Sequence, residues 1–431
     1  MKHPALLALA TLAVYLPSLG GAFQFDDYNV IVDYPTVHSW QAFLERAGGG
    51  VRAVLKASYT LNWTVDSGAF GFHLVNVALH ALNTVLIFFI GKRVTASWLT
   101  GSGTALAAAL LFALHPAQTE AVTYISGRSS SLMASFYLGA LLVHLRGGHW
   151  ALSAILFVLA LATRETAVTL PAALLLYELC RRERPDWKTI LRRQAAHWIV
   201  LAAGALVVLL NASYFELLSY GFSQRGLAGN LLTQVGGISY LLARLVGLHG
   251  YNIDPGVPAY SAWTLTLAFQ AALIVVVVCL GLANLRARPW IAFGVLWFFL
   301  QLAPTNSIVP RLDVANDRQL YLACWGPFLA LSVQIAQLRP TQKIAVSLAG
   351  ALVALFAASN VARQLDYRDE ITLWESSVRE SPWNARARNN LGHAYYLAGR
   401  RSEARLEIEA ALRLDPGYEK ARANLLLLDW K

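Results

Sequence analysis

The stretch 4-PALLALATLAVYLPSLGGAFQFDDYNVIVD-33 places two adjacent carboxylates, Asp26 and Asp27, soon after an apolar run. The run over 4–20 is nearly long enough to cross the hydrocarbon core of a bilayer, about 30 Å thick, as a helix. Lys2 and His3 flank it, and no small-x-small cleavage site lies between the run and the acids, so we interpret it as an uncleaved first span. A signal peptide removed from the mature protein is the alternative.

The composition extends this reading to the whole chain. Of 431 residues, 56% are hydrophobic and 14% are charged, and the mean hydropathy is +0.47. A soluble protein of this size is less apolar and more charged, so we predict an all-α, polytopic membrane protein. The net charge of +10 sits mostly in short loops, where it sets orientation, and it does not indicate a nucleic-acid partner. The three cysteines lie within apolar segments and form no spaced set typical of disulfides or zinc.

Eleven apolar runs are candidates for membrane spans. They cover residues 4–20, 73–91, 99–114, 131–146, 149–163, 166–180, 196–211, 262–284, 290–308, 319–337 and 343–360. The loop 181-RRERPDWKTILRRQ-194 has six basic and two acidic residues, which is typical of a cytoplasmic loop. An inside amino terminus and eleven spans then put the carboxyl terminus outside.

The parity of the spans decides which loops share the non-cytoplasmic side. The expected outer segments are 21–72, 115–130, the junction 164–165, 213–260, 309–318 and everything after about 361. This assignment requires that the apolar piece 231–248 does not cross the membrane. Because it carries Gln234, Gly236, Gly237, Ser239 and Arg244, we interpret it as an interfacial or re-entrant helix, with a twelfth span as the alternative.

The tail after residue 361 is charged and predicted to be helical. The segment 385-ARARNNLGHAYYLAGRRSEARLEIEAALRLDP-416 has the small and apolar landmarks of a tetratricopeptide repeat, from Leu391 and Gly392 to Pro416. We therefore predict two domains, a membrane domain over 1–360 and a short repeat domain over 361–431. The repeat domain either packs as a cap or holds an acceptor or partner polypeptide.

Charged side chains near a bilayer are costly unless they are paired or hydrated, so they indicate function. On the expected outer side they come from loops far apart in the sequence. They are Asp26, Asp27, Arg52, Lys56, His115, Glu120, Arg128, Arg164, Glu165, Arg311, Asp313, Asp317 and Arg318. Acids and bases that gather at one aqueous mouth are suited to an anionic, lipid-linked substrate.

The second span carries a polar stripe at helical spacing, His73, Asn76, His80 and Asn83. We take His73, at the outer end, as a candidate site residue and His80 as part of interhelical hydrogen bonding. No HExxH or calcium-loop pattern occurs, and no cofactor is required by any motif. The possibility that Asp26 or Asp27 holds a divalent cation, Mg²⁺ or Mn²⁺, stays open.

The sequence also lacks a glycine-rich phosphate loop, a GxSxG elbow and a nucleotide-binding βαβ pattern. A soluble nucleotide sugar is therefore a poor candidate for the donor. A polyprenyl-phosphate sugar, delivered through the bilayer, fits an enzyme that faces a compartment without ATP.

Five segments in order, followed by the repeats, resemble the transmembrane and tetratricopeptide repeat O-mannosyltransferase family. They are the FDDY of 25–28, 72-FHLVNVALHALN-83, 114-LHPAQTEAVTYISGR-128, 164-RETAVTLPAALLLYE-178 and 304-PTNSIVPRLDVANDRQLYL-322. The chain departs from the animal proteins at 51-VRA-53, 127-GRSS-130 and 316-NDR-318, which leaves the sugar and acceptor open. The repeat array is also much shorter, which suggests a bacterial member.

The resemblance implies the C-type glycosyltransferase fold, a catalytic acid in the first outer loop and a lipid-phosphate sugar donor. Asp26 or Asp27 would then act as the base that activates an acceptor hydroxyl, with inversion at the anomeric carbon. Arginines and a lysine would bind the donor phosphate, namely Arg318, Arg128, Arg52, Lys56 and Arg164. Substrate-orienting roles are expected for His73, His115, Glu120, Glu165, Asp317 and Tyr321. Glu120, Glu165 and Asp317 are alternatively counter-ions of the arginines.

The resulting prediction is a membrane glycosyltransferase that moves mannose or another hexose to protein Ser/Thr hydroxyls. Its partners would be the bilayer, the lipid-linked sugar and an acceptor protein, and its location a bacterial inner membrane with site and tail facing the periplasm or exterior. A glycan or lipid acceptor is an alternative within this class. A lipid-linked sugar transporter and a non-catalytic repeat scaffold are alternatives outside it. Sequence leaves the oligomeric state open.

Overall fold

The computed structural model describes residues 2–46, 52–98, 101–210, 216, 219–223, 225–247, 250–311, 313–338 and 341–429. Parts of the predicted outer loops, such as 47–51 with Val51 of the 51–53 motif, 213–215 and 248–249, lie outside these residues, as do the span limits 99–100 and 211. Over the described ranges the chain is helical and contains no β-strand.

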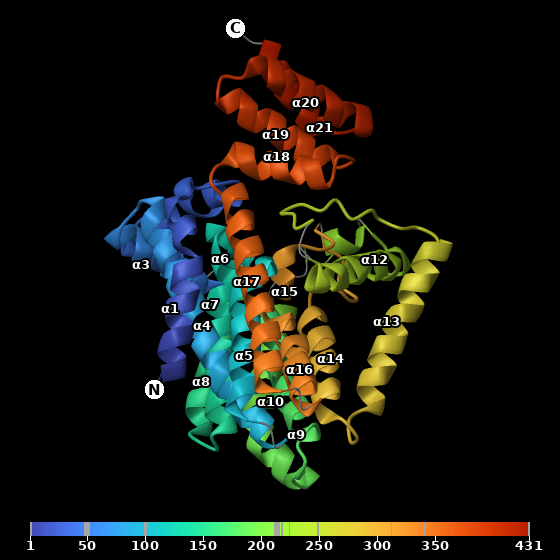
Figure 1. Cartoon of the computed structure of the whole chain (residues 1–431). Helices are drawn as coiled ribbons and strands as arrows, with labels where there is room; N and C mark the ends of the chain where they lie inside the picture. The colour runs from blue at the N-terminus through green and yellow to red at the C-terminus, as the bar shows by residue number, and fades with distance from the viewer. Residues whose placement is uncertain are drawn as a thin grey trace.

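The long apolar runs form a bundle of helices that extend side by side (Figure 1). Its members are α1 (Lys2–Val14), α4 (Ala69–Ala96), α5 (Ser102–Leu114), α7 (Arg128–Leu145), α8 (Trp150–Thr163), α9 (Leu170–Leu179), α10 (Trp187–Leu210), α13 (Leu265–Ala283), α14 (Pro289–Leu302), α16 (Trp325–Gln337) and α17 (Gln342–Asp366). Each of the eleven predicted runs coincides with one of these helices for most of its length.

Fewer than eleven of the described helices are long and apolar enough to be identified as membrane spans. Within the described ranges, α4, α10, α13 and the 346–366 part of α17 are long and apolar enough to cross a membrane, and two bent pairs raise the number to six. The apolar helices α1, α8 and α14 are shorter than eighteen residues. Membrane association is therefore supported, while the count of eleven and the orientation stay predictions.

Both bent pairs occur at a proline-containing junction. Helix α5 turns by 54° into the short helices η5 (Pro116–Gln118) and α6 (Thr119–Val122). The residue before Pro116, His115, is extended with ψ of 132°, because a proline disfavours the helical conformation of the residue that precedes it. The second bend, 50°, joins α15 (Leu320–Ala323) to α16, where Pro327 lies in the first turn and cannot donate a backbone hydrogen bond.

Close helix packing forms the centre of the bundle. Trp297 of α14 meets Trp325 of α16 edge to face, with ring centroids 4.8 Å apart. A Cβ on Gly294 would lie 2.6 Å from the Cβ of Ala330, so only glycine allows this approach of α14 and α16. By contrast, only 11% of the apolar windows of α10 and α13 is buried, which leaves these faces for lipid.

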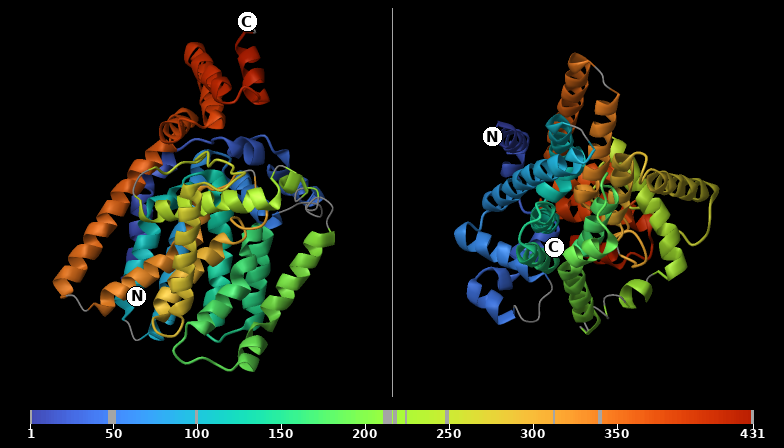
Figure 2. Two further views of the ribbon diagram at one scale, coloured as in Figure 1. Left: turned by 90° about the vertical axis from the view of Figure 1, so that its right-hand side faces the viewer. Right: turned by 90° about the horizontal axis from the view of Figure 1, so that it is seen from below.

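One end of the bundle carries a cap of shorter segments (Figures 1 and 2). It includes α2 (Trp40–Arg46), α3 (Ala53–Val65) and α12 (Leu227–Val246). Figure 2 shows α12 lying across the end of the bundle and not along α13, which is the placement that an interfacial helix requires. Its strongly amphipathic sequence buries Asn230, Thr233, Gln234 and Leu241 against the loops beneath it.

The tail forms four helices beyond this same end (Figure 1). They are α18 (Glu370–Glu380), α19 (Ala385–Leu397), α20 (Arg401–Leu414) and α21 (Glu419–Asp429). Leu391, Ala404 and Ile408 lie in their shared core, and a Cβ on Gly392 would lie 2.5 Å from Ile408, which explains that glycine. Assignment of these helices to the tetratricopeptide class stays a prediction.

The tail contacts the loops at this end of the bundle through ion pairs and an aromatic contact. Arg386 of α19 forms a two-bond ion pair with Asp254, at 2.6 and 2.7 Å, and a third bond to Asp313 at 2.8 Å. Phe25 contacts Trp374 of α18 edge to face at 5.0 Å. The first outer loop, the loop after α12 and the tail are thus one packed assembly.

Candidate active site

The polar outer loops meet between the bundle and the tail. The backbone N–H of Asp26 donates to the Tyr124 hydroxyl at 3.0 Å, and the backbone N–H of Arg318 donates to Glu120 at 3.1 Å. Arg52 donates to both carboxylate oxygens of Glu165, at 3.1 and 2.7 Å. Segments separated by up to 198 residues therefore form one polar centre.

Asp27 is the buried member of the acidic pair. Its Oδ1 accepts hydrogen bonds from the Ser126 backbone N–H at 2.8 Å and from the Ser126 hydroxyl at 2.5 Å, and its Oδ2 accepts from the Gln24 N–H at 3.0 Å. The side chain is 1% exposed. Burial raises the pKa of Asp27 to about 7, although hydrogen bonds from Ser126 and Gln24 act to lower it. Asp27 therefore joins two loops, and both of its carboxylate oxygens are already engaged by hydrogen bonds within the protein.

Asp26 has the opposite character. It is only partly buried, and its carboxylate forms no ion pair with a described residue. Partial burial raises the pKa of Asp26 above its ordinary value, although the positive charge of Arg318 acts to lower it. Of the two acids, Asp26 is the one whose carboxylate is accessible and close to a cation.

A strained backbone position lies directly before the acidic pair. Phe25 has φ of 48°, in the left-handed region that non-glycine residues seldom occupy. Such strain persists where surrounding contacts hold it, and here the Phe25 ring is held against Trp374. The tail helix α18 thus supports the conformation that presents Asp26.

The charge of Arg318 acts on Asp26, and the Arg318 side chain also lines a cavity. Its Nε lies 3.5 Å from Glu120 Oε1, and its side chain is 17% exposed. It lines a small cavity of about 30 Å³ together with Ser130, Arg164, Thr166, Gln301 and Tyr321. A cavity of this size holds one or two water molecules.

Arg164 lines the same cavity and has no carboxylate partner among the described residues. One of its terminal nitrogens donates to the hydroxyls of Ser129 and Ser130, at 3.1 and 2.5 Å. Its Nε is buried and has no hydrogen-bond partner. An arginine held by neutral hydroxyls keeps its positive charge for a ligand, so Arg164 and Arg318 form a site suited to an anion.

Other predicted cations have partners within the protein. Arg128 is fully buried and donates to Asn76 at 2.7 Å, Asn62 at 2.8 Å, and the carbonyls of Ser58 and Phe72. These four bonds tie α7 to α3 and α4 and point away from a ligand role.

Arg52 and Lys56 are likewise engaged. Arg52 is paired with Glu165, which makes Glu165 the counter-ion of Arg52 and not of its sequence neighbour Arg164. Lys56 lies over the Tyr34 ring, 5.4 Å from its centroid, and contacts its hydroxyl at 3.5 Å. Neither residue lines the cavity of Arg164 and Arg318.

Most of the predicted orienting residues hold structure together. His115 contacts the Leu245 carbonyl at 3.2 Å, and Asp317 accepts from the Tyr240 hydroxyl and the Asn252 N–H, both at 2.8 Å. The Tyr321 hydroxyl bonds to His80 and Asn83, so the polar stripe of α4 is interhelical.

His73 lies beneath the first outer loop. It is buried, and neither ring nitrogen makes a hydrogen bond of good geometry. A Cβ on Gly21 would lie 2.9 Å from its Nε2, so glycine permits the loop to approach the ring.

Several residues of the site escaped prediction. Tyr124 and Ser126 anchor the acidic pair, and Gly127 is required because a Cβ there would lie 2.3 Å from the Glu120 carbonyl. All three lie in the quoted segment 114–128, but uncharged residues gave no signal. Arg386 and Asp254 were missed because only the fold brings the tail to the loop.

The surroundings of the acidic pair limit the protein ligands that it could offer a divalent cation. They contain no group of three or more His, Cys, Asp or Glu side chains arranged to hold a metal ion. Both oxygens of Asp27 already accept hydrogen bonds, which leaves Asp26 as a lone ligand.

Comparison with known proteins places the chain beside sugar transferases. It is 25% identical over 455 residues to protein O-mannosyl-transferase F38B6.6 of Caenorhabditis elegans, which covers 96% of this chain and 63% of that protein. It is 25% identical over 501 residues to protein O-mannosyl-transferase TMTC1 of Homo sapiens, which covers 98% and 56%. A match to protein O-mannosyl-transferase Tmtc1 of Drosophila melanogaster is 32% identical over 206 residues, 42% of this chain and 23% of that protein.

The chain therefore spans less than two thirds of the length of these relatives. No model of a protein family and no solved structure matches it. Each of these relatives is named a protein O-mannosyl-transferase. The quoted relatives are animal proteins and lend no support to the expected bacterial origin.

Proposed function

We propose that this protein transfers a hexose, in the first instance mannose, from a polyprenyl-phosphate donor to Ser/Thr hydroxyls of a polypeptide. The observation that carries the proposal is the placement of an acid and two arginines at one end of the bundle. A partly exposed carboxylate, Asp26, lies near Arg318, and Arg318 shares a cavity with Arg164, a buried arginine that has no carboxylate partner among the described residues.

Asp26 is the proposed general base. Its ionised carboxylate takes the proton of the acceptor hydroxyl while the hydroxyl oxygen forms a bond to the anomeric carbon. The bond from that carbon to the phosphate oxygen breaks at the same time, so the configuration inverts and the proton passes from Asp26 to water. Help of this kind contributes on the order of 10²–10⁴-fold to the rate.

Arg318 and Arg164 are the proposed partners of the leaving phosphate. Negative charge grows on its oxygens as the bond breaks, and guanidinium groups in a water-poor site stabilise that charge. Because the cavity is small, the donor phosphate enters only with movement of side chains around it. Asp27 acts by position, since it fixes the loop that carries Asp26.

The tail favours a polypeptide acceptor. It lies at the same end of the molecule as Asp26 and contacts the acidic loop through Trp374 and Phe25. Helical hairpin arrays commonly bind extended peptides. A glycan or lipid acceptor would leave this placement without a role.

The proposed location is a bacterial inner membrane with site and tail facing the periplasm. Support for the sidedness comes from the basic loops at the opposite end of the bundle, such as 181–194.

The test is transfer by purified full-length protein in detergent. Polyprenyl-phosphate [³H]mannose is supplied with Ser/Thr-rich peptides, and labelled peptide is measured for the wild type and Asp26→Asn. We expect transfer by the wild type alone. If a glycan or lipid is labelled in place of the peptide, the proposed acceptor is wrong. Full activity of Asp26→Asn refutes the assigned base. Parallel reactions with EDTA test the divalent cation, and we expect transfer to persist.

A further inference from the structure

A second, larger cavity lies at the end of the bundle opposite Asp26. Its volume is about 510 Å³. Its walls come from the end of α4, the loop between α9 and α10, and the loop between α13 and α14, all remote from the tail (Figure 1). This volume is in the range of sites that hold small molecules.

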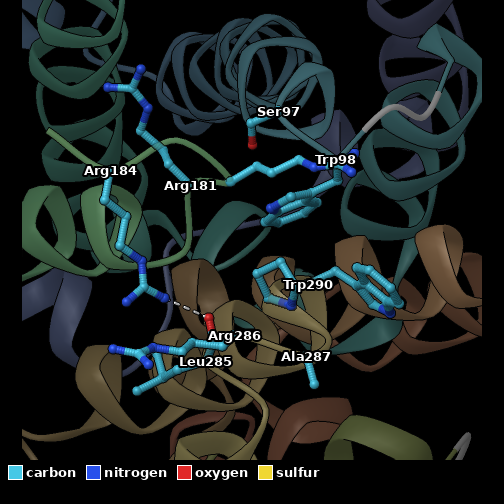
Figure 3. A pocket seen from close by; sticks show the side chains of 10 residues that line it. Ser97, Trp98, Arg181, Arg184, Leu285, Arg286, Ala287 and Trp290 are labelled. Carbon is cyan, nitrogen blue, oxygen red and sulfur yellow. Dashed lines mark hydrogen bonds between the residues drawn. The ribbon is translucent and has the colours of Figure 1, made fainter.

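Four arginines line this cavity: Arg181, Arg182, Arg184 and Arg286. Arg181 donates to Glu178 at 2.9 Å, and Arg184 donates to the Leu285 carbonyl at 2.7 Å, as Figure 3 shows for Arg184. Arg182 and Arg286 form no ion pair with a described residue. Even with Glu178 and the nearby Glu183 counted, the cavity has an excess of positive charge.

Aromatic walls distinguish the cavity from an ordinary basic loop. Trp98 and Trp290 line it beside the arginines (Figure 3). Both indole N–H groups are engaged, by the Cys180 carbonyl at 2.9 Å and by Gln334 at 3.2 Å. The rings therefore offer apolar surface, while hydrogen bonding to a ligand falls to the arginines.

The surroundings favour a ligand with an apolar tail. Leu282 of α13, three residues before Leu285, and Leu191 of α10 are more than half exposed. The apolar windows of both helices are 11% buried and so face lipid. Tryptophan and arginine side by side are typical of the level at which lipid headgroups lie.

We propose that this cavity binds the phosphate headgroup of an anionic lipid. Basic pockets between membrane helices on the cytoplasmic side are suited to such headgroups. Arg182 and Arg286 contact the phosphate oxygens, Trp98 and Trp290 contact the glycerol region, and the acyl chains lie along α10 and α13. The site is separate from the sugar-transfer site and does not depend on it.

The test uses native mass spectrometry of the full-length protein in detergent, titrated with phosphatidylglycerol or phosphatidylcholine. We expect the wild type to retain phosphatidylglycerol preferentially. The double variant Arg182→Gln/Arg286→Gln should lose roughly tenfold or more in affinity for each arginine, because hydrogen bonds to charged groups have about that effect. Both side chains are exposed, so the variant should fold, which its thermal unfolding checks.

The matched control is Arg93→Gln/Arg192→Gln, which removes two exposed arginines of the same end that do not line the cavity. Retained preference in the control and loss in the pocket variant supports the proposal. Equal loss in both variants reduces the effect to general surface charge and overturns it. Inorganic phosphate is titrated in a separate arm, and displacement of the lipid by millimolar phosphate reassigns the cavity to a free anion and overturns the lipid assignment.

Discussion

Asp27 and Ser126 are joined by two hydrogen bonds although 99 residues separate them in the chain. This contact locks the first outer loop onto the segment 114–128 and uses the carboxylate of Asp27 for structure. The adjacent Asp26 remains accessible beside Arg318. Neighbouring acids that look equivalent in the sequence therefore lie in different environments.

Asp26→Asn should abolish transfer while the protein stays folded. Loss of the general base is expected to lower kcat/KM by roughly 10²–10⁴-fold. The partly exposed side chain forms no ion pair with a described residue, so folding should not depend on its charge. Initial rates with a saturating lipid-phosphate donor measure the effect. Asp33→Asn, an exposed acid of the same loop, is the control and should retain the wild-type rate.

Asp27→Asn should act first on stability. The amide oxygen can still accept from Ser126, but the amide nitrogen faces the Gln24 N–H, and two donors then oppose each other. A buried donor without a partner costs about 1–3 kcal/mol. Thermal unfolding in detergent measures the change. A loss of transfer equal to that of Asp26→Asn, without loss of stability, would assign the base to Asp27 instead.

The pH dependence of stability should also depend on Asp27. Its pKa is raised to about 7 by burial, whereas an unfolded aspartate has a pKa near 3.9. Between these values the folded state binds a proton that the unfolded state has released. The contribution of this group to stability is thus complete below about pH 4 and is lost as pH rises through 7. The difference in unfolding free energy between wild type and Asp27→Asn, measured from pH 4 to 8, isolates it.

Arg164→Gln should weaken use of the donor. Removal of a fixed charge that stabilises a leaving group costs on the order of 10²–10³-fold in rate. Steady-state kinetics with varied lipid-phosphate sugar checks this, and Arg164→Lys should recover part of the loss. Lys56→Gln serves as control because Lys56 contacts Tyr34 and does not line the cavity. Equal effects of the two Gln variants would remove Arg164 from the site.

Arg386→Gln should uncouple the tail from the outer loops. It leaves Asp254 and Asp313 without their shared partner, so the tail should become sensitive to limited proteolysis. Under the proposed function, peptide transfer falls while hydrolysis of the donor by water continues. Arg388→Gln, which breaks an ion pair with Glu407 inside the tail, is the matched control. Unchanged peptide transfer by Arg386→Gln would exclude the tail from acceptor binding.

The helical segments were accessible to prediction because their causes are local. An apolar run must satisfy its backbone within itself in lipid, so each of the eleven runs became a helix. The bends at Pro116 and Pro327 also follow from local chemistry, yet the apolar content of 319–337 concealed the second one. The residues that bind the donor phosphate were harder to predict, since five cations were candidates and sequence position could not rank them.

The sequence alone determined an apolar, helical chain with an acidic pair after its first apolar run, basic loops such as 181–194 and a charged helical tail. These features depend on hydropathy and residue spacing, which are properties of short segments. Only the tertiary structure decided that Asp27 is bound by Ser126, that Arg128 donates to carbonyls and amides, and that Arg164 lines a cavity without an ion pair to any residue that the structure describes. The physical reason is that the partner of a buried charge is selected by packing between distant segments, and no local pattern records it.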